Sequence, residues 1–246
     1  MPCLRLNKQV AGFVAAIVVF SACTNHYKDL IVVKPSGSDT KTRAWQAGSD
    51  LNKHDRQAAS LSVDPSCVQK FKPAFTSTLY NTQVNVVGRH LSGLLLFKQM
   101  PDSSMRVVFS SEMGVKFFDF EFGKDGGFTV HQVMKQLDKP SVINTLRSDF
   151  ELLMMRNLPI DSAVVRKDSV LTWVGFPAAF KNGRPKETHY YITDKQCGQL
   201  VRIENAMKRK PKVLILMDNY HNGVPDTIGI THKNFNFDIG LKYIQR

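Results

Sequence analysis

The clearest constraint on the fold is a strict alternation of apolar and acidic side chains near the middle of the chain. Phe118, Phe120 and Phe122 stand at every second position, with Asp119 and Glu121 between them. Successive side chains of a strand point to opposite faces of a sheet. The pattern therefore predicts a strand with one apolar and one polar face. We expect the phenylalanines to face the core and the two carboxylates to face solvent.

Similar runs follow one another along the chain, joined by short connections rich in Gly, Pro, Asn and Asp. We expect strands over residues 83–87, 93–98, 105–110, 115–122, 128–133, 170–175, 188–193, 200–205, 212–217, 227–231 and 236–244. An antiparallel sheet of about ten strands tends to curl or close. The predicted fold is mostly β with minor α, a curved antiparallel sheet with an apolar interior.

One amphipathic helix interrupts the strands. It begins at Pro140, and Val142, Leu146, Phe150 and Leu153 recur with helical spacing. A helix with a single apolar stripe must bury that stripe, and we expect it to lie on the concave side of the sheet as a cap.

The first residues predict a secretory signal. Arg5 and Lys8 form a positive start, and residues 10–20 are apolar. This run is shorter than the roughly 20 residues of a transmembrane helix. Its length, its charged start and the small residues after it are typical of a cleaved signal peptide.

The end of this signal reads Val19-Phe20-Ser21-Ala22-Cys23, which resembles the bacterial lipobox. The resemblance implies cleavage after residue 22, acyl chains on Cys23 and stable membrane anchoring without a transmembrane helix. Thr24 rather than Asp follows the cysteine, which by analogy favours the periplasmic face of the outer membrane. A cleaved signal without lipid is the alternative.

Residues 23–63 are expected to form a flexible tether. Lys, Ser, Thr, Gln and Asp dominate this stretch, and such a composition buries too little apolar surface to offset its ordering entropy. Asp64-Pro65 then predicts an N-cap and first turn of a short helix. The β domain is accordingly expected over residues 64–246.

Two cysteines remain in the expected domain, Cys67 and Cys197. In an oxidising compartment they could pair. The sequence leaves a disulfide and two buried free thiols open, because a bridge requires Cα atoms within about 7 Å. A metal site is not expected, since neither cysteine has a CxxC neighbour or a nearby histidine pair.

The charge balance favours acidic partners. The net charge is +12, of which Arg5 and Lys8 carry two, leaving +10 after removal of the signal. Anionic lipid headgroups suit such a chain, whereas nucleic acid is not expected outside the cytoplasm. The densest basic run, residues 208–212, could contact headgroups or form a solvated hairpin tip.

The order of elements resembles a known family. From Gly93 the chain reads GLLLFKQMPDSSMRVVFSSEMGVKFFDFEF, followed by a glycine turn, a strand and the amphipathic helix. The last residues read VPDTIGITHKNFNFDIGLKYIQR. In this order they resemble the LolA/LolB family of lipoprotein-localisation proteins, and LolB in particular. The resemblance implies a half-open β-barrel whose apolar cavity holds the acyl chains of lipoproteins in transit.

The resemblance also implies site residues. Met113 stands before a glycine in the loop between two central strands, where LolB has an exposed apolar residue; there it would contact a membrane or an acyl chain. The alternative is that Met113 tucks under the sheet edge. The expected groove lining consists of Leu94, Leu96, Phe118, Phe120, Phe122, Leu146 and Phe150. For each of these, ordinary hydrophobic core is the alternative.

We find no positive case for an enzyme. The sequence contains no GxSxG, P-loop, GxGxxG or HExxH motif, and no catalytic residue or cofactor is expected. Asp218, His221 and Asp226 lie close in sequence, but turn-forming residues surround them. Two main readings remain: a lipid-anchored carrier that binds acyl chains, and a non-catalytic structural or interaction lipoprotein with a filled core. A hydrolase with a site near His221 is the third and weakest.

Overall fold

The sheet found in the structure is larger than the one expected. A computed structural model describes Tyr27 and residues 30–33, 63–86, 88–181, 184–207 and 210–245. Residues 1–22 and Cys23, with their expected signal and anchor, lie outside the described residues. The strands are β1 (Ile31–Val33), β2 (Ser77–Val86), β3 (Arg89–Gln99), β4 (Met105–Ser110), β5 (Lys116–Phe122), β6 (Phe128–Val133), β7 (Val164–Lys167), β8 (Leu171–Lys181), β9 (Arg184–Asp194), β10 (Leu200–Met207), β11 (Lys210–His221), β12 (Val224–His232) and β13 (Phe237–Tyr243).

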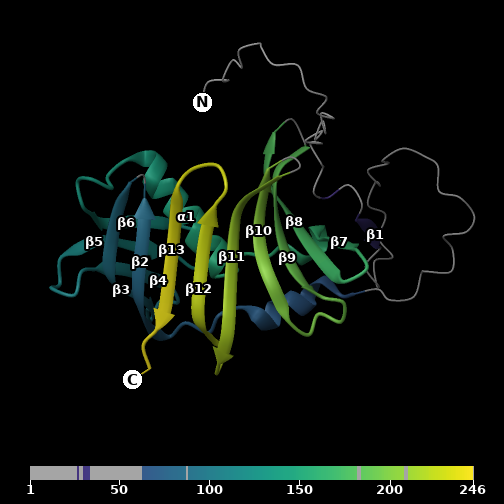
Figure 1. Cartoon of the computed structure of the whole chain (residues 1–246), viewed down its shortest axis with the longest axis horizontal. Helices are drawn as coiled ribbons and strands as arrows, with labels where there is room; N and C mark the ends of the chain where they lie inside the picture. Colours follow the sequence, from purple (N-terminus) through teal and green to yellow (C-terminus); the bar gives the residue numbers. More distant parts are fainter. Residues whose placement is uncertain are drawn as a thin grey trace, which may run out of the picture.

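All these strands form one antiparallel sheet in the order β1-β7-β8-β9-β10-β11-β12-β13-β2-β3-β4-β5-β6. Two meanders, β2–β6 and β7–β13, are therefore joined where β13 pairs with β2 (Figure 1). The sheet stays open, with β1 and β6 as its edges. This confirms the predicted mostly-β, curved and unclosed architecture, with thirteen strands among the described residues instead of about ten.

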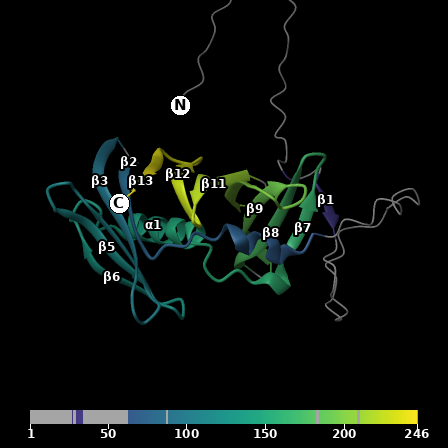
Figure 2. The same cartoon turned by 90° about the horizontal axis from the view of Figure 1, so that it is seen from below.

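Three helices accompany the sheet in the described part of the chain. Helix α1 (Pro140–Leu153) has the predicted start and stripe, and it lies in the hollow of the curved sheet (Figure 2). The 3-10 helix η2 (Pro65–Phe71) begins as predicted, because the Asp64 side chain accepts a hydrogen bond from the Ser66 amide at 2.8 Å. A short 3-10 turn, η3 (Ile160–Ser162), precedes β7.

Strand β2 begins earlier than expected because its inward positions include polar residues. Thr78 and Thr82 are buried in the same alternation as Tyr80 and Val84. Two threonines in an apolar stripe weaken the period-two hydrophobic signal on which the prediction depended. Strand β7, with four residues, is too short to carry such a signal.

The expected tether does not run uninterrupted from Cys23 to residue 63. Residues 31–33 form β1, which pairs with β7 through Val32 and Arg166. Tyr27 is buried against the outer face of the sheet. These residues belong to the folded domain, so the expected domain boundary at residue 64 is corrected. None of the helices described above is long and apolar enough to cross a membrane.

Candidate functional site

The interior beneath α1 is filled with the chain's own aromatic side chains. Phe118, Phe120, Phe122 and Phe150 are all buried in the main core, as is Leu146. Their ring centroids lie 4.5 Å apart for Phe118 and Phe120, and 5.8 Å apart for Phe118 and Phe150. These five expected groove residues are thus brought together, but as close-packed core.

The other two expected groove residues lie on the opposite face of β3. Leu95 and Phe97 point into the core and are fully buried, whereas Leu94 and Leu96 alternate with them and are half-buried on the outer face. The prediction chose the wrong face here. The run from Gly93 to Phe97 is apolar throughout, so it carries no alternation from which the inward face can be read.

An apolar cleft opens at the N-terminal end of α1 instead. It has a volume of about 300 Å³ and lies between the end of β2, the first turns of α1 and the β12–β13 connection. Its lining consists of Val86, Ser141, Val142, Thr145, Phe235 and Phe237. Such a volume is at the lower end of the range for small-ligand sites. Sequence reasoning missed Phe235 because it stands among polar residues.

A buried hydrogen-bonded His–Asp pair lies behind this cleft. His232 Nε2 and Asp149 Oδ2 are 2.8 Å apart, and both side chains are 2% exposed. The His232 ring contacts Phe235 and Phe237, with centroids 4.7 and 4.9 Å away. Burial raises the pKa of Asp149, and the hydrogen bond to His232 opposes that rise. The pair ties α1 to the end of β12.

Two further polar residues, Asn205 and His189, lie in one row with His232 across the sheet. His232 on β12 is paired with Val213, Val213 with Asn205, and Asn205 with His189 on β9. The Asn205 amide donates to Glu187 at 3.0 Å. Burial lowers the pKa of His189. Among the described residues, Asn205 Oδ1 and His232 Nδ1 are buried without a hydrogen-bond partner.

A second hollow, of about 400 Å³, lies on the outer face of β2 and β13. Its walls include Asn81, Gln83 and Lys242, and it forms where Gly240 has no side chain. Ile228 and Leu241 line it as well, but the three polar side chains make it less apolar than the cleft at α1, and burying polar groups without partners is unfavourable. The cleft at α1 is the better apolar site.

Asp119 is not solvent-facing as expected. It is buried on the outer face of β5 and accepts hydrogen bonds from Arg106 Nε at 2.7 Å and Lys116 Nζ at 2.9 Å. Burial alone would raise the pKa of Asp119, but these two cations hold it below its usual range. Glu121 pairs with His131 at 2.6 Å. The polar face of β5 therefore carries the Asp119 ion pairs and the Glu121–His131 hydrogen bond.

Met113 projects from the β4–β5 connection and is 93% exposed. Gly114 follows it with a φ of 83°, and its amide donates to the Ser111 carbonyl at 2.9 Å. The tight turn presents the thioether to solvent rather than under the sheet edge. Val115 is exposed beside it.

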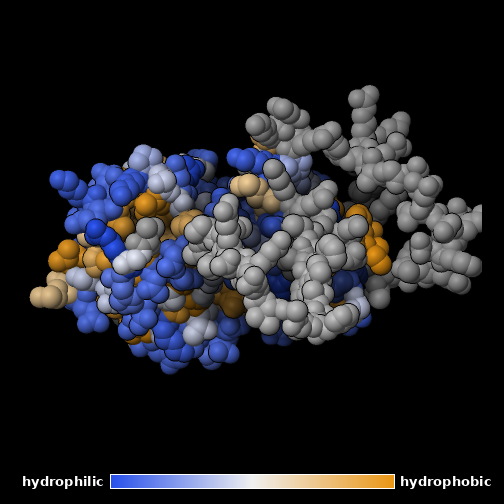
Figure 3. Space-filling model, turned by 45° about the horizontal axis from the view of Figure 1, so that its top comes forward, coloured by the Kyte–Doolittle hydropathy of each residue, from blue (hydrophilic) through white to orange (hydrophobic). Residues whose placement is uncertain are grey.

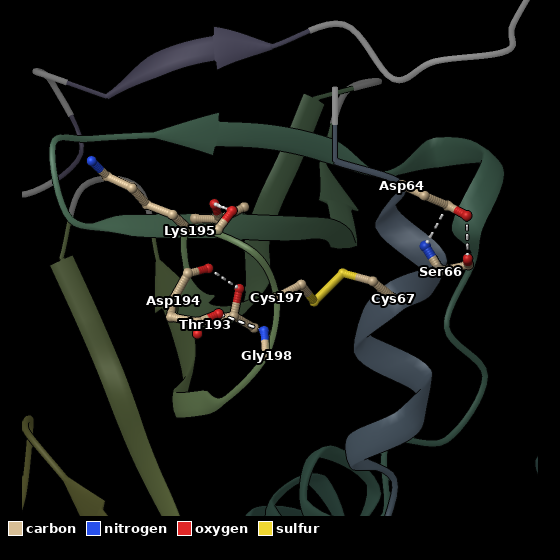
Figure 4. The surroundings of a disulfide bond; sticks show 9 residues. Asp64, Ser66, Cys67, Thr193, Asp194, Lys195, Cys197 and Gly198 are labelled. Atoms are coloured by element: carbon tan, nitrogen blue, oxygen red, sulfur yellow. Dashed lines mark hydrogen bonds between the residues drawn. A yellow bond between two sulfur atoms is a disulfide. The ribbon is translucent and has the colours of Figure 1, made fainter. Parts of the chain in front are cut away.

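A disulfide joins Cys67 and Cys197 (Figure 4). The Cα atoms are 6.4 Å apart and the sulfur atoms 2.12 Å apart. Cys67 lies in η2, and Cys197 lies in the β9–β10 turn, where its amide donates to the Asp194 carbonyl at 3.1 Å. The bond fastens the chain ahead of β2 to the other half of the sheet.

The weakest chemical candidates do not form a site. His221 at the end of β11 and Asp218 within β11 are both exposed, and Asp226 pairs with Lys242. In the described part of the chain, no hydrogen bond joins His221 to a carboxylate, and no cluster of His, Cys, Asp and Glu could hold a metal ion. Residues 208–209 of the basic run lie outside the described residues; Lys212 interacts with Glu187 at 3.5 Å.

Comparisons with known proteins give structural neighbours only. No family model and no curated protein matches the chain. A LolA superfamily protein from Nitrosomonas europaea has 7% sequence identity and a TM-score of 0.43, over 75% of this chain and 92% of its own. A putative outer membrane lipoprotein-sorting protein domain from Vibrio parahaemolyticus has 9% identity and a TM-score of 0.40, over 74% and 90%.

A DUF1329 family protein from Desulfovibrio piger has 8% identity and a TM-score of 0.40, over 74% of this chain and 90% of its own. These three solved structures are among the structural neighbours of this chain.

Proposed function

We propose that this chain is a lipid-anchored protein of the bacterial envelope that binds acyl chains of lipoproteins or lipids in the cleft at α1. The observation that carries the proposal is the lining of that cleft, where Val86, Val142, Phe235 and Phe237 face one hollow. An acyl chain gains about 0.8 kcal/mol for each methylene that leaves water. Affinity would come from this burial, without catalysis.

The anchor in this proposal is an acylated Cys23, on the periplasmic face of the outer membrane. The secretory signal and the lipobox resemblance support it. Met113 is proposed as a second apolar contact for a membrane or an acyl chain, because its side chain is almost fully exposed on a tight turn. The thioether is flexible and suits irregular apolar partners.

A second candidate is a non-catalytic interaction lipoprotein. The filled interior beneath α1 favours it, since Phe118, Phe122 and Phe150 occupy the volume that a larger groove would need. In that case the cleft at α1 would hold no ligand, and the outer face of the sheet would meet an envelope partner.

Binding of a dansylated fatty acid separates the two candidates. The probe is titrated into the mature chain carrying Cys23→Ser, so that no covalent lipid competes. Saturable fluorescence enhancement is expected for the carrier. The substitution Val142→Trp fills the cleft and should weaken binding at least tenfold.

The matched control is Val130→Trp, which adds the same ring to an exposed position on β6, away from the cleft. It should leave binding unchanged. No saturable binding by the unsubstituted chain, or equal losses in both variants, would refute the carrier and favour the interaction lipoprotein. Mass spectrometry of co-purifying lipids gives an independent readout.

A further inference from the structure

Tyr27 packs against Trp173, Tyr190 and Glu204 on the outer face of β8–β10, and we call these three residues the socket. Its ring stacks on Tyr190 at 4.8 Å and meets the edge of Trp173 at 5.6 Å. Its hydroxyl donates to Glu204 Oε2 at 2.6 Å. Only 6% of Tyr27 is exposed, although its contacts lie far away in the sequence. A residue held by two rings and a buried carboxylate is firmly docked.

The socket residues also have contacts that do not involve Tyr27. Tyr190 is paired with Gly175, and a Cβ at that glycine would lie 2.7 Å from the Tyr190 ring. Glu204 is held in turn by Arg202 Nε at 2.6 Å, and the Arg202 guanidinium lies over the Trp173 ring at 5.3 Å. The carboxylate that accepts the Tyr27 hydroxyl is therefore also held by a contact that does not involve Tyr27.

The chain after Tyr27 is fixed at a second point. Leu30 packs against the socket cluster, and β1 pairs with the edge of β7 over three residues, Ile31 with Lys167 and Val33 with Val165. We use the word strap for Tyr27 together with residues 30–33. The strap binds the outer face of the sheet through side chains and the sheet edge through backbone.

The position of the strap shortens the distance from the anchor to the domain. Cys23 precedes Tyr27 by four residues, and four extended residues span at most about 14 Å. A free linker from Cys23 to residue 63 would have a root-mean-square length of about 35 Å. An acyl group on Cys23 must therefore enter a bilayer close to the socket.

We propose that the strap holds the β1–β8 end of the sheet against the bilayer that the acylated Cys23 enters, with the outer face of β1, β7 and β8 as the contact surface. This inference rests on the anchor of the proposed function. It assigns a partner, a phospholipid surface, to a face of the sheet whose role the cleft at α1 does not explain.

The side chains of this face suit a bilayer surface. The strand registers pair Val32 with Arg166 and Arg166 in turn with Trp173, so Val32 shares the face of the socket. Val164 is paired with Gly175 on the same face. Val32 is 61% exposed, and Val164 is exposed as well. Figure 3 shows an apolar patch at this end of the molecule. Apolar side chains next to a cation are typical of interfacial contact.

Strands β4 and β5, whose connection carries the exposed Met113, lie toward the other end of the sheet (Figure 1). Ten to eleven strand spacings of about 4.8 Å separate the β4–β5 hairpin from β1, which amounts to about 50 Å along the curved sheet. The anchoring bilayer should therefore slow hydrogen exchange of backbone amides at the β1 end more than at the β4–β5 connection.

Hydrogen–deuterium exchange of the acylated full chain in phosphatidylethanolamine and phosphatidylglycerol vesicles tests this. The reference is the Cys23→Ser chain, unacylated, with the same vesicles. We expect amides of residues 164–171 to exchange at least fivefold more slowly in the acylated protein, and those of residues 111–115 to change less than twofold.

Two variants test the strap itself. Tyr27→Ala removes the ring and should abolish the protection at residues 164–171, while the acylated protein still sediments with vesicles. Tyr27→Phe keeps the stacking and should retain most of the protection.

Acylated protein without protection at residues 164–171, protection at residues 111–115 instead, or full protection in Tyr27→Ala would overturn the inference and leave the proposed function standing. A mass spectrum showing no acyl group on Cys23 would overturn the anchor of the proposed function as well.

Discussion

Removing the disulfide is expected to lower the stability of the fold strongly. Cys67 and Cys197 are 130 residues apart. In the chain-entropy description, cross-linking a loop of this length lowers the entropy of the unfolded chain enough to stabilise the fold by about 5 kcal/mol. The double substitution Cys67→Ala/Cys197→Ala should remove this contribution.

The measurement is thermal and urea unfolding of the mature chain, followed by circular dichroism. For a chain of this size, about 5 kcal/mol corresponds to a fall in Tm of about 10–20 °C. Cys197 is buried, so Cys67→Ser/Cys197→Ser should lose about 1 kcal/mol more by burying a hydroxyl. The alanine pair separates that cost from the loss of the cross-link.

Reduced wild-type protein is the second control, because it opens the bond without changing the sequence. It should unfold within a few degrees of the alanine pair. A loss below about 1 kcal/mol in both would refute the reasoning, since it would mean that the unfolded chain gains little freedom when the bond opens.

Three further changes test the packing and the charges. Phe150→Ala should cost about 3–5 kcal/mol in urea unfolding by leaving a cavity among the core rings; a loss under 1 kcal/mol would mean that the interior is not close-packed. Asp119→Asn should cost about 2 kcal/mol at pH 7. Because the cations hold the folded-state pKa of Asp119 low, that difference should disappear as the pH falls below about 4, and a pH-independent difference would contradict the pairing. His189→Asn should flatten the loss of stability below about pH 6.5, since burial lowers the folded-state pKa of His189 and the unfolded chain binds its proton first; an unchanged slope would argue against this.

The elements that were predicted correctly are those whose own sequence carries the signal. Helix α1 combines a proline in its first turn with an apolar stripe, and β5 alternates without interruption. In both, the apolar positions of the pattern pack in the core, although Asp119 on the polar face of β5 is buried as well. The faces of β3 were not predictable, because Leu94, Leu95 and Leu96 are identical, and only pairing with β2 and β4 decides which of them points inward.

The strap and the cleft depend on contacts between distant residues. Tyr27 reaches Glu204 over 177 positions, and a single aromatic residue in a polar segment gives no sign of its partner. The cleft unites Val86, Val142 and Phe235 from three parts of the chain. Hydrophobic periodicity identifies residues that become buried, but it does not identify where packing leaves space.

The remaining edge of the sheet has a consequence for self-association. Within the described residues, the outer side of β6 meets no other strand, and its middle residues, Thr129 to Gln132, are exposed. Unpaired backbone groups invite another chain to add a strand. Strand β6 is a poor partner for a further strand, because it has only six residues and its register with β5 is irregular between Asp119 and Phe120. At the opposite edge, β1 is only three residues long. Because neither edge strand readily pairs with another chain, the sheet can stay open without forming fibres.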